Sequence, residues 1–262
     1  MPHLSLENTN FYYEIHGKGH PLVLIAGYTC DHTAWLPIID KLAQHFKVLI
    51  FDSRGVGKTE EKRKVPLSAE LLADDAFRLS QALGFEKASF IGHSMGGTIA
   101  QTIGAKYSNS IEKLGIFNST SKWRQAMLTA MQNHIYMRRN DVSLDIIFHY
   151  FLSWIFGEKL LHNSQDIQEL KKLFLENPYL QSLEDQERQF KVLQNFDGRS
   201  LLKNIKVPTL VLAGKQDLLS LQYEGQHLAS QIPKATYAEI DGAHGLMIEH
   251  PEEVLAVMRN FF

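Results

Sequence analysis

Residues 88–101 read ASFIGHSMGGTIAQ, a stretch in which Ser94 lies between Gly92 and Gly96. The apolar run before the first glycine is strand-like, and the residues after the second are helix-like. A serine at a sharp strand-to-helix turn is lifted clear of its neighbours, and the first N–H groups of the helix point at whatever its oxygen attacks. The glycines fit because a Cβ at either position would collide where strand and helix nearly touch. The stretch therefore predicts a nucleophilic serine at this turn, which we call the elbow (residues 92–96).

Length, composition and charge point to an ordinary globular protein that binds small molecules. The chain has 262 residues, of which 44% are hydrophobic, and its formal charge is −2. This balance gives no field that would attract nucleic acid or an anionic membrane, so neither is an expected partner. Cys30 is the only cysteine, which excludes an intramolecular disulfide and a multi-cysteine metal site. We interpret it as a small loop residue.

The first residues lack a basic segment followed by an apolar one, and no apolar run reaches the ~20 residues that span a bilayer. We therefore expect a cytoplasmic protein, either a monomer or a homodimer.

Apolar, β-branched runs alternate with longer helical patterns, which is typical of βαβ units. The expected strands are residues 4–7, 11–16, 22–25, 48–51, 88–91, 114–117, 209–213 and 236–240. The expected helices are residues 33–45, 68–83, 95–107, 222–231 and one that Pro251 opens. The prediction is an α/β protein with a mostly parallel sheet and helices on both faces.

The alternation stops between residues 120 and 202, where only amphipathic helical stretches rich in aromatic residues and methionine occur. We predict a core made of residues 1–119 and 203–262, with residues 120–202 inserted in it as a helical cap. The insertion follows the strand after the elbow helix, so it should lie over the carboxyl ends of the strands, where ligands bind in such sheets. The charged segment 60–64 is expected to be a solvated surface loop.

A serine hydroxyl is a poor nucleophile, so it needs a base, and the base needs a group that orients it. Asp217 follows a buried strand in the sequence Ala213-Gly214-Lys215-Gln216-Asp217, and it is the candidate orienting carboxylate. His244 lies in a glycine-flanked loop after the last strand and is the candidate base. The order Ser94, Asp217, His244 is that of the α/β-hydrolases, and chymotrypsin-like and subtilisin-like enzymes do not share it.

Negative charge on the reacting oxygen calls for an oxyanion hole. One donor should be the backbone N–H of Met95, directly after the nucleophile. The other is assigned to the backbone N–H of Tyr28, in the loop after strand 22–25, where Gly27 allows close approach. The alternative is that Gly27 only makes a turn.

Two further motifs are set aside. The segment Gly55-Val56-Gly57-Lys58-Thr59 suggests a phosphate loop, but Asp52 stands where the first glycine of that pattern is required. His16 and His20 are four residues apart, but the glycines between them argue against a helix that would present both to a metal. No cofactor and no metal are expected.

Taken together, these motifs make the chain resemble the α/β-hydrolase superfamily. Within it, the chain is similar to the small esterase-like group that includes carboxylesterases, 3-oxoadipate enol-lactonases and pimeloyl-carrier-protein methyl esterases. The segment 51–57, FDSRGVG, is similar to the D-x-R-G-x-G turn of these proteins, in which Asp52 and Arg54 would be structural. The resemblance implies an eight-stranded, mostly parallel sheet with a lid, and two-step hydrolysis through an acyl-serine. In one departure, Ala26-Gly27 stands where many relatives have His-Gly.

The sequence therefore predicts a serine hydrolase for a small to medium carboxylic ester. Hydrolysis of an enol-lactone, of a thioester or of a carbon–carbon bond next to a ketone is an alternative activity. A receptor-like protein with little turnover is an alternative of another class. Four cations of the cap could meet an acidic substrate or a carrier protein, although a solvated helix face is the favoured interpretation: Lys122, Arg124, Arg138 and Arg139.

Overall fold

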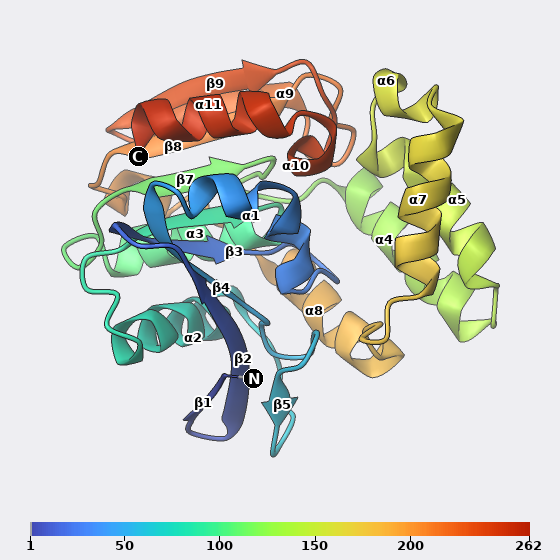
Figure 1. Ribbon diagram of the computed structural model, residues 1–262, viewed down its shortest axis with the longest axis horizontal. Coiled ribbons are helices and arrows are strands. Elements are labelled where there is room, and N and C mark those ends of the chain that lie inside the picture. The colour runs from blue at the N-terminus through green and yellow to red at the C-terminus, as the bar shows by residue number, and fades with distance from the viewer. Residues whose placement is uncertain (1) are drawn as a thin grey trace.

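The computed structural model describes residues 2–262, and its centre is a sheet of nine strands in the order β1-β2-β4-β3-β6-β7-β8-β9, with the short β5 paired to β2 (Figure 1). The six strands β4-β3-β6-β7-β8-β9 run parallel to their neighbours in the sheet, whereas β2 is antiparallel to β1, β4 and β5. The strands are β1 (His3–Leu6), β2 (Thr9–His16), β3 (His20–Ile25), β4 (Phe46–Phe51), β5 (Glu60–Glu61), β6 (Ser89–His93), β7 (Leu114–Phe117), β8 (Thr209–Gly214) and β9 (Ala235–Ile240). The predicted α/β class and the mostly parallel sheet are confirmed.

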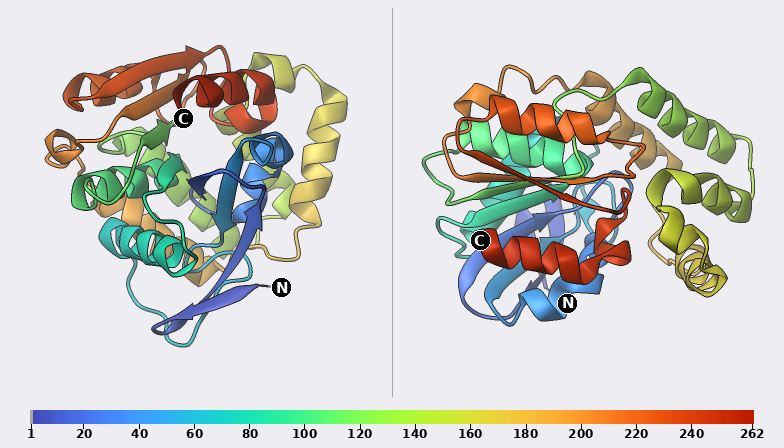
Figure 2. Two further views of the ribbon diagram at one scale, coloured as in Figure 1. Left: turned by 60° about the vertical axis from the view of Figure 1, so that its left-hand side comes forward. Right: turned by 90° about the horizontal axis from the view of Figure 1, so that it is seen from above.

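Helices cover both faces of this sheet because its central strands are apolar on both sides. In β3, Leu22 and Leu24 face one buried cluster, while Val23 and Ile25 face the other, as the alternation of a strand requires. The first cluster is closed by α1 (Leu36–Leu42) and α11 (Pro251–Phe261), and the second by α2 (Ala69–Ala82), α3 (Met95–Lys106) and α9 (Gln222–Gln231) (Figure 2).

The core helices begin and end close to their predicted bounds, with one exception. Ser68 caps α2 by accepting a hydrogen bond from the Leu71 N–H, and Pro251 occupies the first turn of α11. The helix expected over residues 33–45 is instead a 3₁₀ turn, η1 (His32–Trp35), followed by α1, which ends at Leu42. Asp31 caps the 3₁₀ turn and Pro37 lies in the first turn of α1, so two helix starts follow each other.

The segment from residue 120 to 202, all of it described, holds helices and no strand of four residues or more. They are α4 (Gln125–Arg139), α5 (Leu144–Ile155), α6 (Glu158–Leu161), α7 (Ser164–Leu175) and α8 (Leu183–Asn195), with the 3₁₀ turn η2 (Leu202–Asn204) after them. Helices α4 to α7 stand beyond one edge of the sheet layer, while α8 returns toward the core (Figure 1). Phe190, Val192 and Leu193 of α8 are buried in the core cluster, whereas no residue of α7 is buried.

The expectation of a solvated loop at residues 60–64 is wrong for its first part. Residues Glu60 and Glu61 form β5 against β2, and the Glu61 side chain is 4% exposed. Its carboxylate receives two hydrogen bonds from the Arg188 guanidinium of α8, at 2.8 and 2.9 Å. A cation supplied from a distant helix therefore explains why the Glu61 side chain is buried within a stretch whose other residues are exposed.

Across residues 2–262, no helix has both the length and the apolar character needed to cross a membrane.

Candidate active site

Ser94 stands at the turn between β6 and α3 in a strained backbone conformation, with φ at 57°. Its N–H donates to the Phe117 oxygen at 2.9 Å, which ties the turn to the neighbouring strand. A Cβ added to Gly92 would lie 1.9 Å from the Gly96 oxygen, and one added to Gly96 would lie 2.1 Å from the Ile25 oxygen. Only glycine fits at both positions, so the steric reason predicted for the elbow is met by its geometry.

Asp217 and His244 meet at the carboxyl edge of the sheet. The His244 Nδ1 lies 2.8 Å from the Asp217 Oδ2, and both side chains are buried. The same carboxylate also receives hydrogen bonds from the N–H groups of Leu219 and Ser220 and from the Ser220 hydroxyl, at 2.8 to 3.0 Å. A carboxylate held by that many donors acts as an acceptor, so Nδ1 carries the imidazole proton and Nε2 keeps its lone pair.

Two side chains that the sequence did not single out hold the backbone of His244. Its carbonyl oxygen receives the Nε2–H of His93 at 2.9 Å and the Nδ2–H of Asn118 at 3.1 Å. Burial lowers the pKa of His93 to about 3, so this imidazole is neutral. Asn118 also accepts from the Gly214 N–H at 3.0 Å and thereby connects the loops after β7, β8 and β9. Its position directly after a buried strand is the same signal that identified Asp217.

The loop assigned to the oxyanion hole lies against the nucleophile. A Cβ on Gly27 would be 3.1 Å from the Ser94 Cβ, and Tyr28 lines the same cavity as Ser94. Met95, the source of the other assigned donor, is the first residue of α3. The two residues assigned as donors therefore lie next to Ser94, Met95 in the chain and Tyr28 in the wall of the same cavity.

Helix α8 braces this loop through two hydrogen bonds. The Tyr28 hydroxyl donates to the Gln186 carbonyl oxygen at 3.3 Å, and the Thr29 N–H donates to the Gln189 Oε1 at 3.0 Å. Thr29 is held with φ at 62°, a conformation that favours glycine. The sequence carried no signal for Gln189, because its partner lies 160 residues away.

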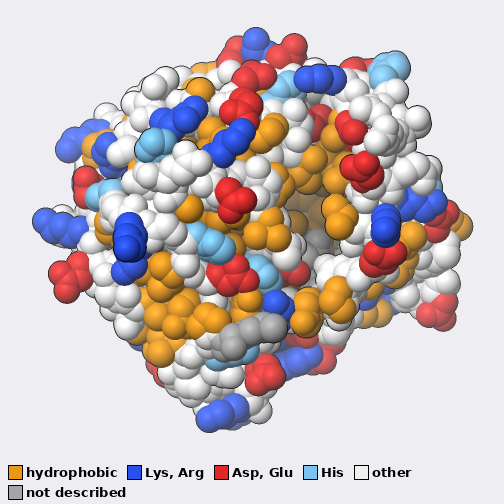
Figure 3. Space-filling model, viewed as in Figure 1, with side chains coloured by type: hydrophobic (Ala, Val, Ile, Leu, Met, Phe, Trp, Pro, Cys, Tyr) orange, Lys and Arg blue, Asp and Glu red, His pale blue; other side chains and the backbone are white. Residues whose placement is uncertain are grey.

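A cavity of about 330 Å³ opens at the predicted nucleophile and base, between the core and the cap. Figure 3 shows a hollow between the two parts, bordered by hydrophobic side chains. Its polar lining is concentrated at the core end, in Tyr28, Thr29, Cys30, His93, Ser94 and His244. The remaining wall consists mainly of Met127, Met131, Ile147, Phe148, Phe151, Leu152, Ile155, Phe156, Leu170, Phe174, Leu193, Leu219, Met247 and Ile248. Among the described residues no Asp, Glu, Lys or Arg lines it.

Cys30 lies in this wall but lacks the properties of a nucleophile. Burial raises the pKa of its thiol to about 12, so the reactive thiolate does not form near neutral pH. This agrees with its interpretation as a loop residue.

A set of contacts, which we call the clasp, joins the cap to the loop that carries His244. The Gly245 N–H donates to the Ile155 oxygen at 2.8 Å. Glu249 receives the Gly157 N–H at 2.6 Å on one carboxylate oxygen and the Ala243 N–H at 2.9 Å on the other. The end of α5 and the residue that precedes α6 are therefore both bonded to the loop that carries His244 or to Glu249 beside it.

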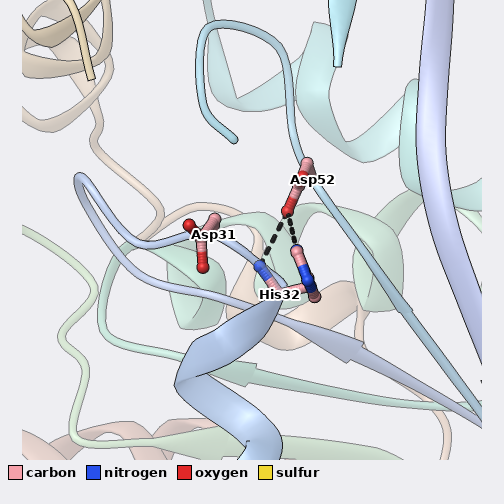
Figure 4. Close-up of side chains that lie close together, drawn as sticks. All are labelled: Asp31, His32 and Asp52. Atoms are coloured by element: carbon pink, nitrogen blue, oxygen red, sulfur yellow. Dashed lines mark hydrogen bonds and ion pairs between the residues drawn. The ribbon is translucent and has the colours of Figure 1, made fainter. Parts of the chain in front are cut away.

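Asp52 forms a second buried cluster with His32 and Asp31 (Figure 4). Its Oδ1 receives both the backbone N–H and the Nδ1–H of His32 at 2.7 Å, and its Oδ2 receives the Lys58 N–H at 2.8 Å. A Cβ on Gly57 would be 2.1 Å from this carboxylate. The glycine-rich segment that suggested a phosphate loop is thus a turn folded around Asp52, and the ligand atoms of the cluster already bond to the protein.

Three of the four cap cations that could meet an acidic partner have an acidic partner within the chain. Lys122 contacts Asp197 and Arg124 contacts Glu224, both at 3.3 Å, and Arg139 contacts Glu187 at 2.8 Å. Arg138 is partly buried and donates to two glutamines instead.

The chain belongs to the alpha/beta hydrolase fold family, whose model matches residues 20–251. It is an α/β-hydrolase enzyme, as its fold, its relatives and its structural neighbours agree. It is 30% identical, over 96% of its length and 94% of the relative's, to a protein of Azorhizobium caulinodans that bears the name carbamate hydrolase RutD. It is 26% identical to 3-oxoadipate enol-lactonase 1 of Acinetobacter baylyi, over 88% of this chain and 84% of that one. The crystal structure of the enol-lactonase from Burkholderia xenovorans LB400 matches with a TM-score of 0.88 and 25% identity, covering 99% of both chains.

Proposed function

We propose that this enzyme is a serine hydrolase that cleaves small to medium, uncharged carboxylic esters through an acyl-serine intermediate. His244 takes the proton of Ser94 as the hydroxyl attacks the ester carbonyl, and Asp217 stabilises the imidazolium that forms. The N–H groups of Tyr28 and Met95 hold the oxyanion. His244 then returns the proton to the leaving alcohol and activates the water that releases the acid.

The observation that carries this proposal is that Ser94 and His244 line one apolar cavity, with Asp217 bonded to His244. Ser94 stands at its strained elbow, and the imidazole oriented by Asp217 at 2.8 Å lines the same space. Strained backbone and a buried, oriented base are costly to maintain, and such features gather where a protein does chemistry.

The character of the wall argues for an uncharged substrate. Burying an unpaired carboxylate in an apolar cavity is strongly unfavourable, and no cationic side chain lines this one among the described residues. An adipate-derived enol-lactone, which the name of one relative indicates, retains a free carboxylate and therefore fits less well. A carbamate reacts at a carbonyl of the same kind and should be compared directly with the esters.

A fluorophosphonate probe, followed by a panel of p-nitrophenyl esters of increasing acyl length with lactones, thioesters and carbamates beside it, tests the proposal. The expected result is labelling of the wild type at Ser94, multiple turnovers on uncharged esters, and a fall in kcat of roughly 10⁴-fold or more in Ser94→Ala. Ser89→Ala changes a buried serine at the start of β6, the strand that leads to Ser94; it is the matched control and should keep both properties. Labelling at another residue would overturn the assignment, and tight ligand binding without a product burst would favour a receptor.

A further inference from the structure

The cap contributes one polar side chain to a wall that is otherwise apolar. From residues 120–202, the lining comprises methionine, isoleucine, leucine and phenylalanine side chains, and in addition His134 of α4. A polar imidazole in an apolar wall carries a free-energy cost unless its nitrogens find partners. The partners of His134 therefore decide what it can do.

A relay of hydrogen bonds fixes the tautomer of this imidazole. Arg138 donates from Nη1 to the Gln186 Oε1 at 2.8 Å, and the Gln186 Nε2 lies 2.9 Å from the His134 Nδ1. Arginine can only donate, so the amide oxygen of Gln186 faces it and the amide NH₂ faces His134. Nδ1 must then accept, and the proton of the neutral ring resides on Nε2.

The surroundings keep this ring neutral and the relay rigid. Burial, together with the charge of Arg138, lowers the pKa of His134 to about 4. Gln186 is fully buried, and its backbone oxygen also accepts the Tyr28 hydroxyl, so the relay is anchored to the loop beside Ser94. Arg138 forms no ion pair with any described residue, and its second hydrogen bond goes to the Gln181 oxygen at 2.8 Å.

A histidine that only filled space would not require this relay. The ring of His134 packs on Phe151 with centroids 4.6 Å apart, which a phenylalanine at position 134 could reproduce. The relay requires a buried glutamine, and it requires a partly buried arginine that has no acidic partner. Its effect is to leave the His134 ring with one N–H donor, on Nε2. Among residues 2–262 no acceptor pairs with this Nε2–H, and His134 lines the cavity, so a ligand there can accept the hydrogen bond.

We propose that the Nε2–H of His134 binds a neutral acceptor oxygen, such as a ketone, ether or hydroxyl oxygen, in the apolar part of the substrate away from the scissile carbonyl. The inference rests on the proposed function and names the class of substrate within it: an ester whose acyl or alkyl chain carries one uncharged oxygen. A chain without that oxygen leaves the donor unpaired, and a hydrogen bond of this kind changes kcat/KM by roughly 3- to 10-fold.

Matched ester pairs test the specificity. We would compare p-nitrophenyl octanoate with analogues in which a ketone is moved one carbon at a time along the acyl chain. The wild type should favour one ketone position by roughly 3- to 10-fold in kcat/KM, and His134→Phe should lose that preference while it still hydrolyses the octanoate. Met131→Leu, an apolar change in the same helix and the same wall, should keep it. An equal ratio in the wild type and His134→Phe would overturn the inference and leave the serine-hydrolase proposal intact.

A second measurement does not depend on turnover or on a variant that folds. In wild-type protein with nitrogen-15-labelled histidine, NMR should show His134 protonated at Nε2 and not at Nδ1. Adding 2-octanone should shift this Nε2 resonance, while the methyl signals of Met127 and Met131 report that the cavity is occupied. An Nδ1–H tautomer, a filled cavity without an Nε2 shift, or no binding of the ketone at all would each overturn the inference. If no ester is hydrolysed, the proposed function fails and this measurement still decides the role of His134.

Discussion

Replacing Gln189 by leucine should slow catalysis far more than it destabilises the fold. The change removes the acceptor that holds the Thr29 N–H at 3.0 Å, and with it the contact that keeps Thr29 in its left-handed conformation. Leaving that N–H unpaired costs about 1–3 kcal/mol. The Gln189 Nε2, however, is itself buried without a partner among residues 2–262. Its removal relieves a free-energy penalty of similar size, so the two effects largely cancel. The free energy of unfolding should therefore change by less than about 1.5 kcal/mol.

The oxyanion loop, by contrast, loses its brace next to Tyr28. Removal of one oxyanion donor costs roughly 10²- to 10³-fold in kcat, and a loosened donor should cost part of that, about 10- to 100-fold. KM should change little, because the oxyanion contact strengthens only in the transition state.

Steady-state kinetics on a p-nitrophenyl ester measures the expected fall in kcat, and urea denaturation of the same samples measures the expected small change in the free energy of unfolding. Gln194→Leu is the matched control, since it makes the same change at an exposed position of the same helix and should leave kcat intact. The reasoning is refuted if Gln189→Leu keeps kcat within twofold of the wild type, or if its loss of activity simply follows a loss of folded protein.

Three further outcomes follow from the geometry. Glu249→Gln should lower the free energy of unfolding by about 1–2 kcal/mol in urea, because an amide nitrogen cannot accept the second N–H of the clasp. Gly92→Ala should prevent folding or cost more than about 4 kcal/mol, because its Cβ would lie 1.9 Å from a backbone oxygen; Gly84→Ala, at positive φ but in open space, should cost only about 1–2 kcal/mol. Burial lowers the pKa of His93 from 6.5 to about 3, so the unfolded chain binds the extra proton. The resulting stability is fully present above pH 6.5 and is lost as the pH falls toward 3, at up to about 1.4 kcal/mol per pH unit, and His93→Gln should remove this part of the slope.

Each of these outcomes has a clear contrary result. Wild-type stability in Glu249→Gln would show that the second hydrogen bond to this side chain contributes nothing. Equal destabilisation by the two glycine variants would contradict the steric account of the elbow. Acid unfolding curves of the wild type and His93→Gln that run parallel between pH 6.5 and 3 would contradict the buried neutral imidazole.

The sequence predicted the strands and the candidate triad because their signals are local. Ser94 lies within a pentapeptide whose glycines have a steric cause, Asp217 lies in the loop after the buried strand β8, and His244 lies in the loop after the last strand, β9. Parallel strands then bring these loops to one edge, so the order along the chain was enough to indicate the meeting in space.

What the sequence did not reveal depends on contacts between distant segments. Glu61 is buried because Arg188 reaches it from a helix 127 residues further on, and Thr29 is braced by Gln189 across 160 residues. No periodicity carries such a pairing. Asn118 is the exception, since it follows a buried strand and could have been proposed on the same grounds as Asp217.

Helix α7 supplies Leu170 and Phe174 to the cavity, yet none of its residues is buried. Under the proposed function, side chains that contact the substrate therefore stand on an element that contributes little to the folding free energy. We expect substitutions there to alter the preferred chain length with only small changes in melting temperature, whereas the core-facing α8 cannot change as freely. In evolutionary terms, the enzyme can acquire new substrates along one helix without first accumulating spare stability.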